Sequence, residues 1–204
     1  MISPYFGLEV TTWKQKTLEL IATHPLTGTE ICEVVLTAWQ DIFTSQIGAA
    51  KAQIGQDIFF TPQIMATLIQ ELSALELQRR YPDVWRRDRS KNEKDLVYLP
   101  NAYYSIEVKA SSSANDIFGN RSYAQISTTS QKSKSGFYIA INFEKFATDA
   151  HGDFVVSESK KPKITNVRFG WLDHTDWKGQ KAQTGQQASL TTRAKHNKLV
   201  SVMP

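Results

Sequence analysis

The sequence predicts a mixed α/β (α+β) fold, in which a central sheet is flanked by helices and preceded by a helical N-terminal part. Two observations predict this class. Apolar side chains recur at helix-like spacing through the first 80 residues, whereas strand-like runs separated by polar turns follow residue 94. A chain of 204 residues that is 41% hydrophobic is long enough to bury one core. We therefore expect a single domain over residues 1–204, with a helical subregion at 1–60 and a core at 61–204.

Three helices are expected in the first 80 residues. Apolar residues that recur from position 13 predict a short helix that stops before Pro25. Residues 27–30, Thr-Gly-Thr-Glu, form a capping box, which satisfies free N–H groups at the start of a second helix. Thr61 and Pro62 are a capping residue and a first-turn proline, so a third helix begins there. This helix must end near Pro82, because proline disfavours the helical conformation in the residue before it.

Strands are expected in the rest of the chain. Residues 100–102, Pro-Asn-Ala, predict a hairpin turn between the first two of them. Residues 136–143 are almost continuously apolar, as in a strand covered on both faces. A short helix over 189–198 is expected near the end of a mostly antiparallel arrangement. The expected strands lie at 95–99, 103–110, 136–143, 153–156, 164–172 and 198–202.

The composition excludes several classes of protein. The only cysteine, Cys32, can form neither an internal disulfide nor a cysteine metal cluster, which excludes a disulfide-stapled secreted fold. No run approaches the roughly 18 apolar residues that span a membrane, and the N-terminus does not resemble a signal peptide. We expect a soluble, cytoplasmic protein.

The net charge of +4 is unevenly distributed along the chain. Residues 1–78 carry eight acidic residues against three lysines, a balance of −5, which leaves +9 for residues 79–204. Seven arginine and lysine residues lie within residues 79–94. The basic part is therefore where a polyanionic partner would bind, although surface cations often serve only solubility.

The strand at 103–110 carries an acid and a base on one face. Side chains alternate along a strand, so Glu107 and Lys109 point away from Ile106 and Val108. A three-residue turn at 100–102 would place Asp95 opposite Glu107, with Cβ atoms about 5 Å apart. Two facing carboxylates repel unless a cation lies between them, and oxygen ligands of this kind suit Mg²⁺. These residues predict metal-assisted phosphodiester hydrolysis; an exposed ion pair on a strand is the alternative.

An acid before a hairpin strand, then Glu107-Val108-Lys109 and a serine-rich segment, resembles the PD-(D/E)xK nuclease superfamily, whose core is a central mixed sheet flanked by helices. More narrowly, residues 106–125 and 168–180 resemble the type II restriction endonucleases of the ScaI-like group, and the resemblance covers roughly residues 61–190. It implies a prokaryotic, Mg²⁺-dependent endonuclease that cuts both strands of a short palindromic DNA site as a homodimer. Asp95 and Glu107 would be metal ligands, Lys109 the catalytic lysine, and a DNA methyltransferase would protect the host.

One departure from the superfamily motif concerns its first acid. The motif begins with Pro-Asp, whereas Asp95 follows a lysine, and a literal Pro-Asp occurs at Asp83. Nothing places Asp83 opposite Glu107, so we assign it to a turn. A helix carboxylate joins the metal site in some members of the superfamily. Glu76, which falls within the apolar stripe of the third helix, is a better candidate than Glu71, and pairing of Glu76 with Arg79 or Arg80 is the alternative.

The polar segment after the catalytic strand has the composition of a loop that contacts DNA. The residues expected near DNA are Asn115, Asn120, Arg121, Ser122, Tyr123 and Gln125. A weaker second set is Gln180, Gln183, Gln186, Gln187, Arg193 and Lys195. A plain surface loop is the alternative. The segment 173–176, Asp-His-Thr-Asp, favours hydrogen bonding within a turn over a metal cluster.

Two other functions compete with a restriction endonuclease. A repair or junction-resolving nuclease would use the same catalytic residues on mismatched or branched DNA. A non-catalytic DNA-binding module would bind without Mg²⁺. Residues 1–60 form an acidic, helical part that is not expected to contact DNA, and we expect it to contribute to dimerisation.

Overall fold

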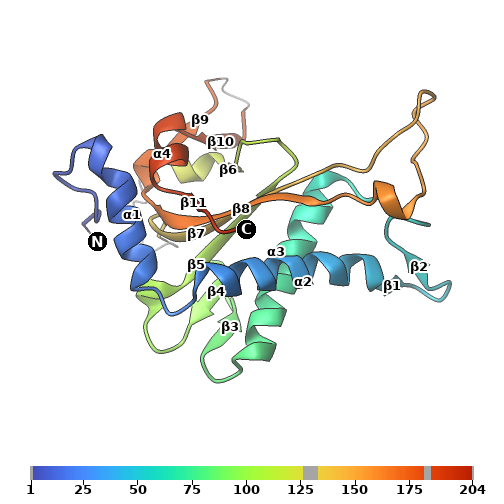
Figure 1. Cartoon of the computed structure of the whole chain (residues 1–204), viewed down its shortest axis with the longest axis horizontal. Coiled ribbons are helices and arrows are strands. Elements are labelled where there is room, and N and C mark those ends of the chain that lie inside the picture. The colour runs from blue at the N-terminus through green and yellow to red at the C-terminus, as the bar shows by residue number, and fades with distance from the viewer. Residues whose placement is uncertain (1, 126–132, 182–184, 204) are drawn as a thin grey trace.

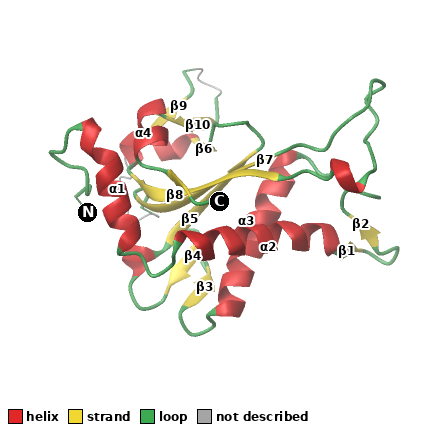
Figure 2. Ribbon diagram, viewed as in Figure 1, coloured by secondary structure: helices red, strands yellow, loops and turns green. Residues whose placement is uncertain are grey.

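The computed structural model describes residues 2–125, 133–181 and 185–203. Among these residues, the central element is a six-stranded sheet in the order β11-β8-β7-β5-β4-β3 (Figures 1 and 2). Strands β5 and β7 are parallel and the other neighbouring pairs are antiparallel, so the sheet is mixed. Its strands are β3 (Trp85–Arg87), β4 (Leu96–Tyr98), β5 (Ile106–Ser111), β7 (Gly136–Phe143), β8 (Ile164–Leu172) and β11 (Val200–Ser201).

The three expected N-terminal helices are confirmed. They are α1 (Trp13–Ala22), α2 (Gly28–Thr44) and α3 (Pro62–Arg80). Both hydrogen bonds of the predicted capping box are present at the start of α2. Helix α3 ends before Tyr81 as expected, although Thr61 makes no side-chain capping hydrogen bond. No helix in the described part of the chain is long and apolar enough to cross a membrane.

Strand β7 separates two apolar cores, which explains its continuous apolar sequence. Phe137, Ile139 and Ile141 pack into the core that contains residues of α1, α2 and α3. Tyr138 and Ala140 point to the other face and pack into a second core. That face is covered by a small antiparallel sheet in the order β6-β10-β9 and by a short helix. These elements are β6 (Phe118–Asn120), β9 (Trp177–Gly179), β10 (Gln187–Leu190) and α4 (Thr192–Asn197).

The connection between β4 and β5 differs from the tight hairpin turn that we expected. The predicted register is confirmed, since Leu96 lies opposite Ile106. The intervening chain, however, contains a 3-10 helix, η2 (Ala102–Tyr104), which the side chain of Asn101 caps by accepting from the Tyr103 N–H. Strand β5 therefore begins at Ile106 instead of residue 103.

The expected strand at 153–156 is wrong. Phe154 makes only an isolated bridge with Thr148, in an arm that extends from the end of β7 away from the sheet before the chain returns as β8 (Figure 1). The ring of Phe154 stacks on Phe59, with centroids 4.4 Å apart, in a cluster close to the start of α3. The apolar character of this segment thus reflects a local aromatic cluster rather than a place in the sheet. A short hairpin of β1 (Gln46–Ile47) and β2 (Ala52–Gln53) was not predicted.

The last strand is shorter than expected because the chain approaches β8 closely just before it. A Cβ atom at Gly170 would lie 2.0 Å from the carbonyl oxygen of Lys198, so only glycine permits this approach. Lys198 and Leu199 are buried, and the strand β11 contains only Val200 and Ser201.

Candidate active site

The two carboxylates that we expected to face each other come from neighbouring strands. Asp95 directly precedes β4, and Glu107 is the second residue of β5, so each carboxylate lies next to the paired residues Leu96 and Ile106. The carboxylate of Asp95 accepts a hydrogen bond from the backbone N–H of Val108 at 2.8 Å. Both carboxylates are almost fully buried, with 5% and 1% exposure. An acidic pair at this depth needs compensating donors or a cation.

Glu107 and Lys109 share one face of β5, as the alternation predicts. Ile106 and Val108 pack on the other face in the core that contains residues of the helices. The ammonium of Lys109 donates to Glu107 Oε1 at 2.8 Å and to the carbonyl oxygen of Val108 at 3.1 Å. The lysine is thus held beside the carboxylate while its side chain keeps 16% exposure.

A third group at this site was not recognised from the sequence as part of it. The hydroxyl of Tyr123 donates to Glu107 Oε1, and the tyrosine side chain is buried. Burial and the adjacent negative charge of Glu107 raise the pKa of Tyr123, so the phenol stays protonated and donates. We expected Tyr123 to contact DNA, and the structure places its hydroxyl against the carboxylate of Glu107. Nothing in the local sequence pattern connects the two residues.

A cavity of about 510 Å³ adjoins Lys109. It lies between the N-terminal end of α3, the last residues of β5 and the small sheet. A volume of this size accommodates a phosphodiester and its neighbouring groups. Its lining residues include Gln63, Lys109, Ser112, Asn120, Lys145 and Gln187.

Several of the residues expected to contact DNA are accessible. Asn120 lines the cavity that also reaches Lys109, and it pairs with Gln187 across β6 and β10. Gln187 belongs to the second, weaker set, so the structure brings one member of each set together. The members of the first set with exposed side chains are Asn115, Asn120, Ser122 and Gln125.

Other members of the two sets make contacts within the chain. Arg121 is half-buried, and its guanidinium donates to the carbonyl oxygen of Gly185 at 3.2 Å. Arg193 lies over the ring of Trp13, and Lys195 pairs with Asp116 at 2.6 Å. Gln180 and Gln186 lie on either side of residues 182–184, and Gln183 itself is outside the described residues.

Glu76 makes the ion pairs that we considered as the alternative to metal binding. Its carboxylate accepts from Arg79 at 2.8 Å and from Arg80 at 2.7 Å. The hydrogen bond from Arg79, followed by that from Arg80, lowers the pKa of Glu76 although burial opposes the shift. Glu71 pairs with Arg87 at 3.0 Å. Among the described residues, no group of three His, Cys, Asp or Glu side chains is arranged to hold a metal.

The basic segment 79–94 is partly neutralised within the chain. Arg86 donates to both carboxylate oxygens of Glu93, and these hydrogen bonds lower the pKa of Glu93 to about 2. Fewer of these cations are therefore available for DNA than the sequence suggested. The ion pairs of the segment include Arg79 and Arg80 with Glu76, Arg80 with Glu33, Arg86 with Glu93, and Arg87 with Glu71.

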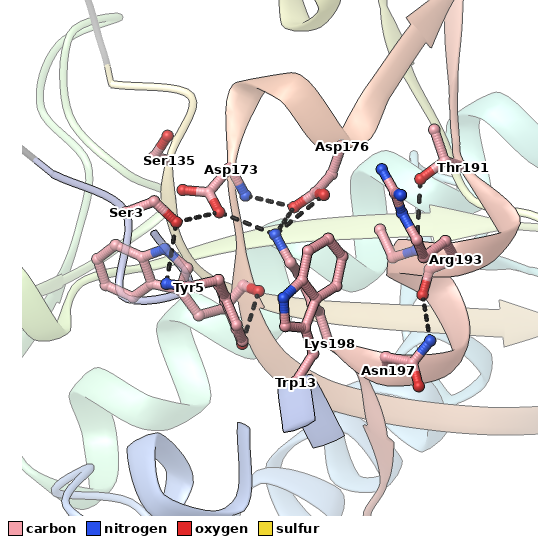
Figure 3. A network of polar contacts seen from close by, with 12 residues as sticks. Ser3, Tyr5, Trp13, Ser135, Asp173, Asp176, Thr191, Arg193, Asn197 and Lys198 are labelled. Carbon is pink, nitrogen blue, oxygen red and sulfur yellow. Dashed lines mark hydrogen bonds and ion pairs between the residues drawn. The ribbon is translucent and has the colours of Figure 1, made fainter. Parts of the chain in front are cut away.

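The acidic turn at 173–176 is structural, as we favoured. Asp173 and Asp176 cap a 3-10 helix, η5 (His174–Asp176), through reciprocal hydrogen bonds. Figure 3 shows the ammonium of Lys198 pointing between the two carboxylates, 2.9 Å from Asp173 and 2.8 Å from Asp176. Ser3 donates to Asp173 as well, so the turn joins the N-terminal segment to the last part of the chain.

The donors at Asp95 and Glu107 fit a divalent cation. Mg²⁺ is bound in proteins through one or two carboxylates, with water and substrate phosphate completing its oxygen ligands. Two buried carboxylates provide this donor set, and Lys109, which donates to one of them, lines a cavity that a phosphate can enter. A third protein carboxylate is not required by that chemistry.

A mixed sheet that carries a carboxylate pair and a lysine beside such a cavity is the arrangement of a restriction-endonuclease-like nuclease. Residues 3–203 match the ScaI restriction endonuclease family. Over 201 residues the chain is 43% identical to the type II restriction enzyme ScaI of Streptomyces caespitosus, covering 98% of this chain and 84% of that protein. No solved structure matches this chain. The chain belongs to the ScaI restriction endonuclease family.

Proposed function

We propose that this chain is a type II restriction endonuclease that cuts both strands of DNA at a short palindromic sequence, using Mg²⁺. One observation carries the proposal: Glu107 and Lys109 lie on one face of β5, with Asp95 held to the same strand, beside a cavity of about 510 Å³. Membership of the family favours this function over a repair nuclease, a junction-resolving nuclease or a non-catalytic DNA-binding module.

Each member of the site has a distinct part in the proposed hydrolysis. Asp95 and Glu107 would hold the cation, which would supply positive charge to the scissile phosphate and lower the pKa of the attacking water. Lys109 is held by Glu107 at 2.8 Å and orients that water, while its charge stabilises the phosphate as negative charge develops. Burial of the two carboxylates strengthens these electrostatic interactions.

We assign the reading of bases to the side of the cavity formed by the small sheet. Asn120 and Gln187 lie opposite each other on β6 and β10, and amide side chains of this kind form paired hydrogen bonds with adenine. Asn115, Ser122 and Gln125 are exposed beside them in sequence and contribute further DNA contacts. Lys145 also lines the cavity and binds a phosphate.

The catalytic assignment is tested by incubating the protein with plasmid DNA and Mg²⁺. We expect discrete fragments from the wild type and from Lys16→Ala, whose lysine pairs with Glu19 on α1 and serves as the matched control. Lys109→Ala should lose at least about a hundredfold in cleavage rate, in line with removal of a group that stabilises charge as it develops. A smear, or full activity in Lys109→Ala, would contradict the proposal.

We further propose that two copies act together, because a palindromic site has twofold symmetry and each chain carries one such site. Residues 1–60 are the proposed interface, supported by the exposed side chains of Ile2 and Phe6, at 80% and 81%. Co-purification of two differently tagged copies tests this, and Phe6→Asp should weaken it. A cytoplasmic location and pairing with a DNA methyltransferase belong to the same proposal; a methyltransferase gene beside this one would support the pairing.

A further inference from the structure

We propose that Tyr123 is a positioning residue for the cleavage reaction: its hydroxyl holds the Glu107 carboxylate in the orientation that binds the cation and places Lys109. The inference rests on the proposed function of Glu107 and Lys109. It assigns to Tyr123 a role in preparing the metal site instead of the contact with DNA that its sequence neighbourhood suggested.

Two donors converge on a single oxygen of Glu107. The hydroxyl of Tyr123 and the ammonium of Lys109 both donate to Oε1. Rotation of the carboxylate would move this oxygen away from both donors, so the two bonds together hold its orientation. Since Glu107 in turn holds Lys109, the orientation set by Tyr123 extends to the lysine.

The ring of Tyr123 is itself held firmly. It packs against Trp177, with centroids 5.1 Å apart, and its residue is only 5% exposed. A Cβ atom at Gly119 would lie 3.1 Å from the Tyr123 ring, so the absence of a side chain there makes room for it. The ammoniums of Lys109 and Lys134 lie 4.8 and 4.4 Å from the ring centroid. These contacts fix where the hydroxyl points.

The burial of Tyr123 also argues against a direct contact with bases. Its hydroxyl, the group that would read a base edge, donates to Glu107. The residues on either side, Ser122 and Ala124, differ from it: Ser122 is exposed and Ala124 half-buried. The same short 3-10 helix, η3 (Arg121–Ala124), therefore presents Ser122 outward and Tyr123 inward.

The test is Tyr123→Phe, which removes the hydroxyl and keeps the ring with its contacts to Trp177 and the two lysines. The matched control is Tyr5→Phe, since Tyr5 is 4% exposed and its hydroxyl bonds Thr17 at 2.8 Å in the other core. Mn²⁺ affinity is measured by electron paramagnetic resonance, and duplex affinity is measured without metal. Thermal unfolding monitors the fold of each variant.

We expect Tyr123→Phe to bind Mn²⁺ about ten- to a hundredfold more weakly, with metal-free duplex affinity unchanged and both unchanged in Tyr5→Phe. Gly119→Ala, which displaces the ring while keeping the hydroxyl, should weaken Mn²⁺ binding in the same direction. Unchanged Mn²⁺ affinity in Tyr123→Phe and Gly119→Ala would overturn the inference. Weaker metal-free binding of DNA by Tyr123→Phe would also overturn it, in favour of a DNA contact.

Glu107→Gln separates this inference from the proposed function. If that variant binds Mn²⁺ as the wild type does, the metal site itself is wrongly assigned. If it loses Mn²⁺ while Tyr123→Phe does not, the metal site stands and only the role of Tyr123 fails.

Discussion

The carboxylate of Asp95 accepts a hydrogen bond from the backbone N–H of Val108 at 2.8 Å. This bond connects one proposed metal ligand to the strand that carries the other, next to Glu107. It also supplements the pairing of β4 with β5, for which a single residue pair, Leu96 with Ile106, is present among the described residues. The proposed metal site and the local strand pairing therefore depend on the same side chain.

This double role predicts different outcomes for two variants of Asp95. Asp95→Asn keeps an oxygen that accepts from Val108 but lacks the charge, so it should fold like the wild type and cleave DNA at least about a hundredfold more slowly. Asp95→Ala leaves a buried N–H unpaired and should also lower the free energy of unfolding by about 1–3 kcal/mol. Cleavage assays and urea unfolding check both. Wild-type cleavage by Asp95→Asn would exclude it as a required metal ligand.

The ion pairs of Glu76 predict a structural role for this carboxylate. Glu76→Gln should lower the free energy of unfolding by about 1–3 kcal/mol, because Arg79 and Arg80 lose a charged acceptor in a partly buried setting. Its Mn²⁺ affinity should equal that of the wild type. Reduced Mn²⁺ affinity in a folded Glu76→Gln protein would instead place Glu76 in the metal site.

The buried cation of Lys198 predicts a large loss of stability on substitution. Lys198→Met leaves Asp173 and Asp176 buried without their partner, and should lower the free energy of unfolding by about 3–5 kcal/mol. Lys195→Met is the matched control on the same part of the chain, since its partner Asp116 is 55% exposed, and should change stability by at most about 1 kcal/mol. Equal effects of the two variants in urea unfolding would contradict this account.

His24 predicts a dependence of stability on pH. Its Nε2 lies 3.0 Å from the carbonyl oxygen of Tyr104 and its Nδ1 lies 3.1 Å from the Leu26 N–H, an arrangement that a neutral ring with the proton on Nε2 satisfies. Burial lowers the pKa of His24 in the folded state. The unfolded chain therefore takes up a proton that the folded chain resists, and the free energy of unfolding should fall as pH drops below about 6.5.

Urea unfolding between pH 5 and 8 measures this dependence in the wild type, in His24→Gln and in His151→Gln. The step below pH 6.5 should be smaller in His24→Gln, and it should remain in His151→Gln, whose side chain is exposed in a turn. If the free energy of unfolding decreases equally below pH 6.5 in all three proteins, groups other than His24 cause the decrease.

Local chemistry in the sequence determined much of the fold and the centre of the proposed site. The capping box at 27–30 and Pro62 set the starts of α2 and α3, because these signals act within one turn of a helix. The period of two along β5 placed Glu107 and Lys109 on one face, and the register of β4 brought Asp95 to the same place. Each of these features depends on neighbours a few residues away or on one short connection.

Packing between distant segments decided the rest. Phe154 stacks on Phe59 in an aromatic cluster and is not part of the sheet. The local pattern of apolar residues does not distinguish such a cluster from a strand. Asn120 came to lie opposite Gln187 because β6 and β10 pair across 67 positions of the chain. Tyr123 reached Glu107 because the small sheet packs on the face of β7 opposite α1, α2 and α3. Such contacts depend on which apolar surfaces pack against each other. Local sequence patterns do not identify these partners, because the partners are far apart in the sequence.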